Sequence, residues 1–374
     1  MKNKNKNNLI AGIVIAVLII AVVLISISPK QEGDEETIKI GFITPLTGPF
    51  ADWGESIKYG LELGLEDTNH KFSVDYQDSA CDPKETVTIA QKFFNLDNIK
   101  IIIGPGCVSG LRAIAPMADK KNALLFSTGL LDDAVFEEYS SVLNFATQIS
   151  TEADYMAEFM KSINLKKVAI VHSTNYFGQE YAKRLPESLE EKGIEISSIN
   201  PTDLDLMDFR TVILKIKKDN PDAIFIDQGE IQIGLFAKQL KELDYSIPLY
   251  GYYGIESPSV LESGGKALEG LIYTFPYNNA KDSEGEKDFE KRYEEKYNEI
   301  PTATSLFTYD GILLIDKALE ECNEKDTDCI KDFFINLGIY EGLSGKMKFN
   351  KDGSLDREFV IKTIKGGKFV EYSK

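Results

Sequence analysis

The sequence predicts an α/β protein with two doubly wound, parallel-sheet lobes, preceded by one transmembrane helix. Strand-like and helix-like patterns alternate along almost the whole chain after residue 37, which is typical of βα units. Several strand segments, such as KVAIVH and DAIFID, are almost continuously apolar, which indicates strands buried on both faces beneath helices. About 340 residues follow the apolar N-terminal stretch, which is enough for two lobes with separate cores.

The N-terminal stretch predicts the compartment. Nineteen consecutive residues from Leu9 carry no charge and would span roughly 28 Å, close to the hydrocarbon thickness of a bilayer. Lysines precede this stretch and acids follow it, so the positive-inside rule predicts a cytoplasmic tail over 1–8, a signal-anchor over 9–28 and an outer tether over 29–37. A cleaved secretory signal is the competing interpretation, disfavoured by the length of the stretch and by Pro29. Both interpretations place the body of the protein outside the cytoplasm.

The body is strongly acidic. The full chain has a formal net charge of −18, and without the four lysines of residues 1–30 the Lys and Arg total falls from 42 to 38 against 60 acids, which leaves −22. Nucleic acid is therefore excluded as a partner, and anionic lipid surfaces are poor ones.

Four cysteines in an extracytoplasmic body predict two disulfides. Cys81 and Cys107 would close a loop worth about 3.5 kcal/mol in the chain-entropy model. Cys322 and Cys329 would close a short acidic loop, CNEKDTDC. With only two histidines in the chain, we predict no metal site and no cofactor, and the sequence has no nucleophile elbow and no phosphate-binding loop, so we predict no enzymatic activity.

The alternating pattern gives five βα units before residue 150 and five between 165 and 277. A helix-rich stretch over 283–337 and two closing strands follow. The predicted strands are 38–44, 72–77, 99–104, 123–127, 142–146, 167–172, 194–199, 222–227, 247–250, 270–275, 358–365 and 368–372.

Doubly wound sheets bind ligands at the carboxyl ends of their strands, and the turns rich in glycine and polar residues follow strands here. In IKIIIGPGCVSG a β-branched strand ends at a glycine-rich turn, and a helix pattern begins near Ser109. Unpaired N–H groups at such a helix start are suited to hold an oxygen atom of a small ligand.

The chain resembles type I periplasmic substrate-binding proteins of the leucine/isoleucine/valine-binding group. The resemblance rests on IKIGFITPLTGPFADWGESIKYGLELGLED, DSACDPKE, IGPGCVSG, VAIVHSTNYFGQE and SLFTYDGILLIDKAL. It implies two lobes joined by a three-strand hinge that close on a ligand, with a first lobe over 37–150 and 278–345 and a second over 151–277 and 346–374. It also implies the Cys81–Cys107 disulfide.

The resemblance carries over ligand-binding positions unevenly. Trp53 and Phe177 match aromatic residues that pack on the ligand, and Ser109, Ser127 and Gly129 lie in the matching turns. Four positions depart from the pattern of members that bind α-amino acids, which have a hydroxyl, a threonine, an aromatic residue and a carboxylate where this chain has Val108, Leu131, Gly229 and Tyr253.

The missing carboxylate bears on the ligand, because an ammonium group buried without an acidic partner is strongly unfavourable. Either Asp227, Glu230 or Glu256 replaces it, or the ligand lacks an ammonium group. We predict a small, rather apolar ligand bound by aromatic residues that include Tyr252.

The resemblance implies a solute-binding protein that delivers its ligand to an ABC permease and its ATPase subunits. The apolar N-terminal stretch predicts that this protein is tethered to the membrane. A ligand-sensing ectodomain that signals through a partner protein is the alternative. A scaffold whose lobes no longer close is a third interpretation.

Overall fold

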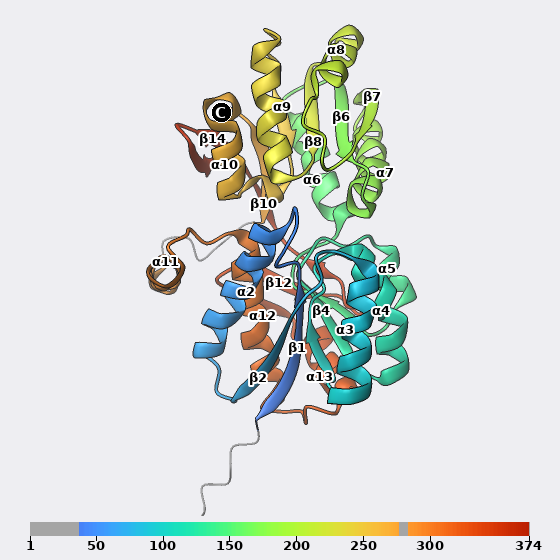
Figure 1. The fold of residues 1–374 in the computed structure, drawn as a ribbon, viewed down its shortest axis with the longest axis vertical. Coiled ribbons are helices and arrows are strands. Elements are labelled where there is room, and N and C mark those ends of the chain that lie inside the picture. Colours follow the sequence, from blue (N-terminus) through green and yellow to red (C-terminus); the bar gives the residue numbers. More distant parts are fainter. Residues whose placement is uncertain (1–36, 277–282, 374) are drawn as a thin grey trace, which may run out of the picture. The chain divides into compact units, whose positions relative to one another are not determined.

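The computed structural model describes residues 37–276 and 283–373 (Figure 1). The predicted tail, the anchor over 9–28 and the tether up to residue 36 lie outside the described residues. Within the described residues, none of the helices combines the length and the apolar character needed to cross a bilayer.

Three sheets organise the body, and residues 39–374 belong to one structural unit. The strands are β1 (Ile38–Thr44), β2 (Phe72–Asp78), β3 (Ile101–Ile103), β4 (Leu124–Ser127), β5 (Val142–Asn144), β6 (Lys167–Ser173), β7 (Glu195–Thr202), β8 (Ala223–Asp227), β9 (Leu249–Gly251), β10 (Ile272–Pro276), β11 (Ile339–Gly342), β12 (Gly345–Phe349), β13 (Leu355–Asp356), β14 (Phe359–Lys365) and β15 (Lys368–Glu371).

The helices alternate with these strands through both large sheets. They are α2 (Ala51–Glu66), α3 (Pro83–Lys92), α4 (Val108–Lys121), α5 (Ala134–Glu138), α6 (Ile149–Ser162), α7 (Tyr176–Glu191), α8 (Arg210–Asp219), α9 (Glu230–Glu242), α10 (Pro258–Gly264), α11 (Glu284–Tyr297), α12 (Ala303–Leu319) and α13 (Thr327–Asn336).

The two large sheets have the same strand order. The first sheet runs β2-β1-β3-β4-β5, and the second contains β7-β6-β8-β9-β10, so that in each the second strand lies outside the first. The pairs β1–β3, β3–β4 and β4–β5 are parallel, as are β6–β7, β6–β8, β8–β9 and β9–β10. The predicted doubly wound α/β architecture is confirmed, and we call the two sheets with their helices the first and second lobes.

The continuously apolar strands are those that helices cover on both faces of the sheet. In β4 and β8 every residue is buried, because helices shield both sides of a central parallel strand. The first-lobe core includes Phe93, from the helical turn that follows α3, and Leu111 and Ile114 of α4. The side chains of these three residues are buried.

The chain passes between the lobes three times: between β5 and α6, between β10 and α11, and between β13 and β14. Residues 277–282 of the second pass lie outside the described residues. The two closing strands β14 and β15 add antiparallel to β10 at the edge of the second sheet.

The small sheet β11-β12-β13 was not predicted. Its strands are only two to five residues long. In β12 Met347 and Phe349 alternate with lysines, but the alternation covers too few residues to predict a strand. The predicted lobe boundary at residue 346 falls inside β12, whose Phe349 packs on Phe334 of α13 at 5.0 Å between ring centroids.

Candidate functional site: an acidic, aromatic cleft between the lobes

A cleft of about 810 Å³ lies between the two lobes, at the carboxyl ends of the strands. It is lined by the N-terminal turns of six helices, α2, α4, α7, α9, α10 and α12, with the loops before them. This is where parallel α/β sheets place their ligand sites, because each strand hands over to a helix at that edge.

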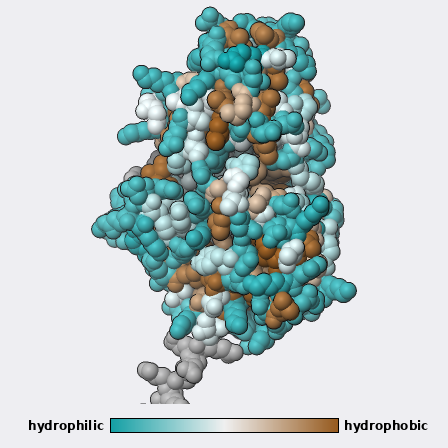
Figure 2. Space-filling view, in the orientation of Figure 1, coloured by the Kyte–Doolittle hydropathy of each residue, from teal (hydrophilic) through white to brown (hydrophobic). Residues whose placement is uncertain are grey.

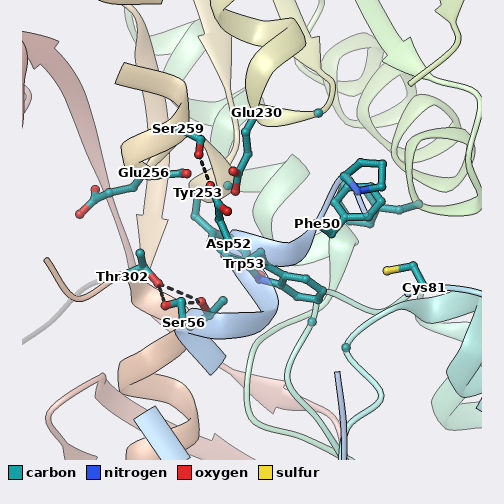
Figure 3. A pocket seen from close by; sticks show the side chains of 18 of the residues that line it. Phe50, Asp52, Trp53, Ser56, Cys81, Glu230, Tyr253, Glu256, Ser259 and Thr302 are labelled. Atoms are coloured by element: carbon teal, nitrogen blue, oxygen red, sulfur yellow. Dashed lines mark hydrogen bonds between the residues drawn. The ribbon is translucent and has the colours of Figure 1, made fainter. Parts of the chain in front are cut away.

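Trp53 of α2 lies on the first-lobe side of the cleft, close to the turn that precedes α4 (Figure 3). A Cβ atom on Gly106 would lie 2.3 Å from the Trp53 ring, so only a glycine allows the indole to approach this turn. The Cys81–Cys107 disulfide, with 5.6 Å between the Cα atoms, ties the loop after β2 to the same turn. Both predicted disulfides are present.

The start of α4 presents main-chain donors to the cleft. Val108 is buried and Ser109 is partly exposed, and both line the cleft. No side chain among the described residues caps this helix end, so its first N–H groups are left for another acceptor. The Gly129 amide, unlike the N–H groups at the start of α4, already has an acceptor, because it donates to the Ser127 hydroxyl at 3.4 Å.

Aromatic rings line the second-lobe side of the cleft. Phe177, in the first turn of α7, lies 5.4 Å from the Tyr252 ring, and Tyr252 lies 5.9 Å from the Tyr253 ring. Asn175 fixes the start of α7 by accepting a hydrogen bond from the Gly178 amide at 2.8 Å. These three rings give the cleft an apolar face.

A buried carboxylate supports the aromatic loop from behind. Glu152 of α6 is fully buried and accepts hydrogen bonds from the Tyr253 amide at 3.0 Å and from the Thr274 hydroxyl. Burial raises the pKa of Glu152 to about 8. Sequence analysis missed this residue, because a single glutamate within an amphipathic helix carries no signal of burial.

The two lobes contact each other on both sides of the cleft. On one side the Ser259 hydroxyl of α10 donates to Asp52 of α2, and Figure 3 shows Glu230 pointing toward the same carboxylate. On the other side the Tyr176 hydroxyl of α7 lies 3.4 Å from a carboxylate oxygen of Asp132. The guanidinium of Arg112, which is paired with Asp132, lies 5.7 Å from the centre of the Tyr176 ring.

The predicted site residues divide into two groups. Seven of them line the cleft: Trp53, Val108, Ser109, Gly129, Phe177, Gly229 and Tyr253. Ser127 and Leu131 do not. The Ser127 hydroxyl is directed at the Pro105 carbonyl, at 3.3 Å, and Leu131 is fully buried in the first-lobe core.

The three acids that the sequence offers as partners for an ammonium group have different surroundings in the structure. Asp227 is buried beneath the cleft and does not line it, and burial raises its pKa to about 7. Glu256 lines the cleft but pairs with Lys362 at 2.6 Å. Glu230 lines the cleft, and burial raises the pKa of its carboxyl to about 7.

The residues of α12 and its preceding loop were missed altogether. Thr302, Ala303 and Thr304 line the cleft from a helix that returns to the first lobe late in the chain. The Ser56 hydroxyl of α2 lies 2.5 Å from that of Thr302 and fixes the approach of the two helices. Only the tertiary fold brings these residues to the site.

Hydrophilic side chains cover most of the face seen in Figure 2, as expected for an acidic chain in which 27% of residues are charged.

Among the described residues, no group of three or more His, Cys, Asp or Glu side chains is arranged to hold a metal ion.

The curated relatives of this chain include proteins named for the amino acids that they bind. A leucine-, isoleucine-, valine-, threonine- and alanine-binding protein of Pseudomonas aeruginosa is 23% identical over 333 residues, covering 86% of this chain and 87% of the relative. A leucine-specific-binding protein of Salmonella typhimurium is 23% identical and covers 95% of both chains.

Solved structures share the fold at low identity. A leucine-binding protein of Thermotoga maritima superposes with a TM-score of 0.84 at 22% identity, covering 90% of this chain and 98% of that one. An ABC-transporter solute-binding protein of Rhodopseudomonas palustris, in complex with 3,4-dihydroxybenzoic acid, gives 0.82 at 23%, covering 91% and 97%.

The family model of the periplasmic binding proteins matches residues 37–368. These residues include every strand of the first sheet and every strand of the second except most of β15. The predicted resemblance is confirmed: this chain belongs to the periplasmic binding protein family and is related to its leucine/isoleucine/valine-binding members.

Proposed function

We propose that this chain captures a small organic solute between its two lobes and delivers it to an ABC permease with its ATPase subunits. One observation carries the proposal: a single cleft is lined from both lobes, with main-chain donors at the start of α4 on one side and aromatic rings on the other. A ligand that contacts both sides stabilises the arrangement in which the lobes approach each other.

The proposal assigns ligand contacts to the seven predicted residues that line the cleft. Trp53 and Phe177 pack on the apolar body of the ligand, and the amide of Ser109 holds a polar atom. Val108 and Tyr253 fill positions where amino-acid-binding members have polar side chains, so they shape the cleft without donating side-chain charge. No catalytic step is part of the proposal.

Tethering by residues 9–28 belongs to the same proposal. An anchored binding protein stays beside the outer face of the membrane, which raises its effective concentration at the permease. The acidic composition of the body supports this geometry, because it disfavours adhesion to anionic lipid.

The test is to identify the solute that remains bound when the protein is purified under mild conditions, by native mass spectrometry. Re-addition of that solute to the stripped protein is expected to raise the melting temperature and to reduce the radius of gyration in small-angle scattering. A protein that retains no solute and that neither stabilises nor compacts with any member of a metabolite library contradicts the proposal.

A further inference from the structure

Two buried carboxyl groups lie beneath the aromatic side of the cleft, away from the surface that a solute would touch. Glu152 of α6 and Asp227, the last residue of β8, are each at most 2% exposed, and neither lines the cleft. One oxygen of each, Oε2 of Glu152 and Oδ2 of Asp227, has no hydrogen-bond partner among the described residues. The buried Tyr181 hydroxyl of α7 lacks a partner as well. Buried polar atoms normally have partners, so these three oxygens call for an explanation.

The three groups form one cluster. Tyr181 interacts electrostatically with both carboxyls, and the charge of Asp227 acts on Glu152. Gly178 allows the first turn of α7 to approach β8, since a Cβ atom there would lie 3.0 Å from Oδ2 of Asp227. The Tyr181 ring stacks on Phe225 of β8 with 5.2 Å between ring centroids. The packing of α6 and α7 on β8 therefore gathers the three groups inside the second lobe.

No lysine or arginine balances this cluster within the part of the chain that the structure describes. The titratable groups that face it come from β6 and from the loop after β9: His172, Tyr252 and Tyr253. His172 is in register with Asp227, and its Nδ1 lies 2.9 Å from the Ser173 carbonyl oxygen. Burial lowers the pKa of His172, so its ring is neutral at pH 7. Tyr252 also faces Glu230 on the cleft side.

A proton is the counter-charge that suits such a pair. Burial raises the pKa of both carboxyls, and the charge of Asp227 raises that of Glu152 further, because two negative charges repel each other strongly in a low-dielectric interior. A proton on one carboxyl also supplies an O–H donor to a cluster in which acceptor oxygens outnumber donors. A metal ion is less suited, because no third His, Cys, Asp or Glu of the described residues completes a metal site here.

The cluster supports the aromatic side of the cleft. Glu152 accepts hydrogen bonds from the Tyr253 amide at 3.0 Å and from the Thr274 hydroxyl. The Tyr252 ring lies 6.0 Å from the Tyr181 ring and 5.9 Å from the Tyr253 ring, and both Tyr252 and Tyr253 line the cleft. Full ionisation of the pair places charge behind these rings. A buried charge favours local opening that admits water, so ionisation loosens the packing around it.

We propose that Glu152 and Asp227 form a proton-binding site, which keeps the aromatic loop over residues 252–255 packed while it holds a proton and loosens that loop when both carboxyls are ionised. One wall of the cleft is thereby a pH-sensitive element. The inference goes beyond solute capture, and it is tested on the ligand-free chain, so its failure leaves the proposed function standing and the failure of the proposed function leaves it standing.

Difference infrared spectroscopy tests the proton site, because the C=O stretching band of a protonated carboxyl is separate from the bands of a carboxylate. The wild type is expected to show a protonated-carboxyl band at pH 7 that Glu152→Gln lacks and that is largely lost by pH 9. In Asp227→Asn the Glu152 band should disappear at lower pH than in the wild type, because no neighbouring charge opposes its ionisation.

Two infrared results would overturn the proton site. One is a wild-type spectrum at pH 7 that matches that of Glu152→Gln in this band. The other is loss of the band when sodium or potassium chloride replaces choline chloride, which would show that a metal cation occupies the cluster. The wild-type titration and the salt exchange need no variant, so they decide the matter even where a substitution impairs folding.

Hydrogen exchange measured by mass spectrometry tests the coupling to the aromatic loop. After correction for the chemical exchange rate at each pH, residues 249–257 of the wild type are expected to exchange about 10-fold faster at pH 9 than at pH 7. This exchange should be insensitive to low concentrations of urea, which marks local opening rather than global unfolding. Glu158→Gln, on the exposed side of α6, should behave like the wild type.

Glu152→Gln isolates the contribution of the pair, because glutamine keeps an acceptor for the Tyr253 amide and cannot ionise. Its corrected exchange over residues 249–257 should change less than about 3-fold between pH 7 and pH 9. A wild-type loop that exchanges equally fast at both pH values, or only through a urea-sensitive route, would overturn the coupling. An equal acceleration in Glu152→Gln would do the same.

Discussion

The guanidinium of Arg357 donates to the carbonyl oxygen of Phe145 at 2.5 Å and to that of Ala146 at 3.0 Å. Arg357 lies between β13 and β14, and the two carbonyls follow β5, so these bonds join two of the three passes between the lobes. The side chain is buried and rests 4.2 Å from the centre of the Phe307 ring. Burial lowers the pKa of Arg357 to about 9, offset in part by the charge of Asp310.

Removing this guanidinium is expected to weaken the whole fold. Arg357→Met leaves the Phe145 and Ala146 carbonyls without donors and leaves the buried Asp310 without its nearby cation, a change that costs about 3–5 kcal/mol. Urea denaturation measures the free energy of unfolding. Arg210→Met is the matched control, because Arg210 pairs with Glu242 at the exposed surface and its loss costs about 0–1 kcal/mol. Similar losses in both variants would show that the passes are not held by Arg357.

Glu152 makes stability depend on pH. Its pKa in the folded chain is raised to about 8 by burial, above its usual value, so the unfolded chain releases this proton at lower pH than the folded chain. Stability is therefore lost as pH rises from the unfolded pKa through about 8.

Glu152→Gln keeps the acceptor for Tyr253 and Thr274 and removes the charge. The variant is expected to equal the wild type near pH 4 and to be more stable, by roughly a few kcal/mol, at pH 9. Melting curves across this range measure the difference. Glu158→Gln, on the exposed side of the same helix, should show no such gain. A constant difference between Glu152→Gln and the wild type at every pH would contradict the assignment.

The two disulfides are expected to differ in their effect on the cleft. Replacing Cys81 and Cys107 by serine opens a loop with a sequence separation of 26 residues and costs about 3.5 kcal/mol in the chain-entropy model. It also weakens solute binding, because both residues line the cleft. The matched pair Cys322 and Cys329 spans 7 residues, so its replacement costs about 2.4 kcal/mol and leaves affinity unchanged. Equal affinity in both double variants would refute a positional role for the first disulfide.

Trp53 is the only tryptophan of the chain, so its fluorescence reports on the cleft. Gly106→Ala places a methyl group where the indole lies and is expected to displace the ring, change the emission spectrum of the ligand-free protein and weaken binding of the retained solute about 10-fold or more. Gly285→Ala is the control, because an added Cβ there would lie 3.3 Å from the Leu343 side chain and 4.0 Å from the Ser283 hydroxyl. An unchanged spectrum in Gly106→Ala would show that the ring does not rest on this turn.

The affinity for a solute that carries an ammonium group, such as phenylalanine, is expected to fall at low pH if Glu230 is its counter-ion. The pKa of Glu230 is about 7 in the ligand-free protein, and a bound cation lowers it, so binding requires the ionised carboxylate and weakens as pH falls through 7. Asp52 from α2 faces the same carboxyl and raises its pKa, and Ser257 and Ser259 lower it. Titration calorimetry should show a loss of about 5-fold between pH 7 and 6, because the ionised fraction of Glu230 falls from about one half to about one eleventh. The dependence should vanish in Glu230→Gln, and a wild-type affinity that is flat over this range would exclude Glu230 as the counter-ion.

The strands of the two large sheets could be predicted from the sequence, and those of the small sheet could not. Each of the twelve predicted strands is present, because long apolar runs such as β8 have few alternatives to a buried parallel strand. The strands β11 to β13 were missed, since their stability depends on contacts such as those of Ser344, whose amide donates to Asp310 at 2.6 Å, 34 residues earlier in the chain.

The site was predicted where it follows from strand ends, and not where it follows from tertiary contacts. Trp53 and Phe177 line the cleft as expected, because each follows a strand and begins a helix. Leu131, which was predicted to contact the ligand, does not line the cleft, since the chain after β4 turns its side chain into the core. Nothing local distinguishes Glu230 from Glu256, whose partner Lys362 is 106 residues away.

The shared strand order of the two large sheets has a consequence for how this protein can be redesigned. Every lining residue belongs to a loop or to the opening turns of a helix, so the scaffold that keeps the chain folded and the surface that chooses a solute are separate parts. If the cleft holds the solute as proposed, exchanging the short turn around Gly229 and Glu230, or the one around Tyr252, is expected to alter the choice of solute while the buried strands beneath stay untouched. Solute preference in this architecture is therefore a modular property, open to change a few residues at a time.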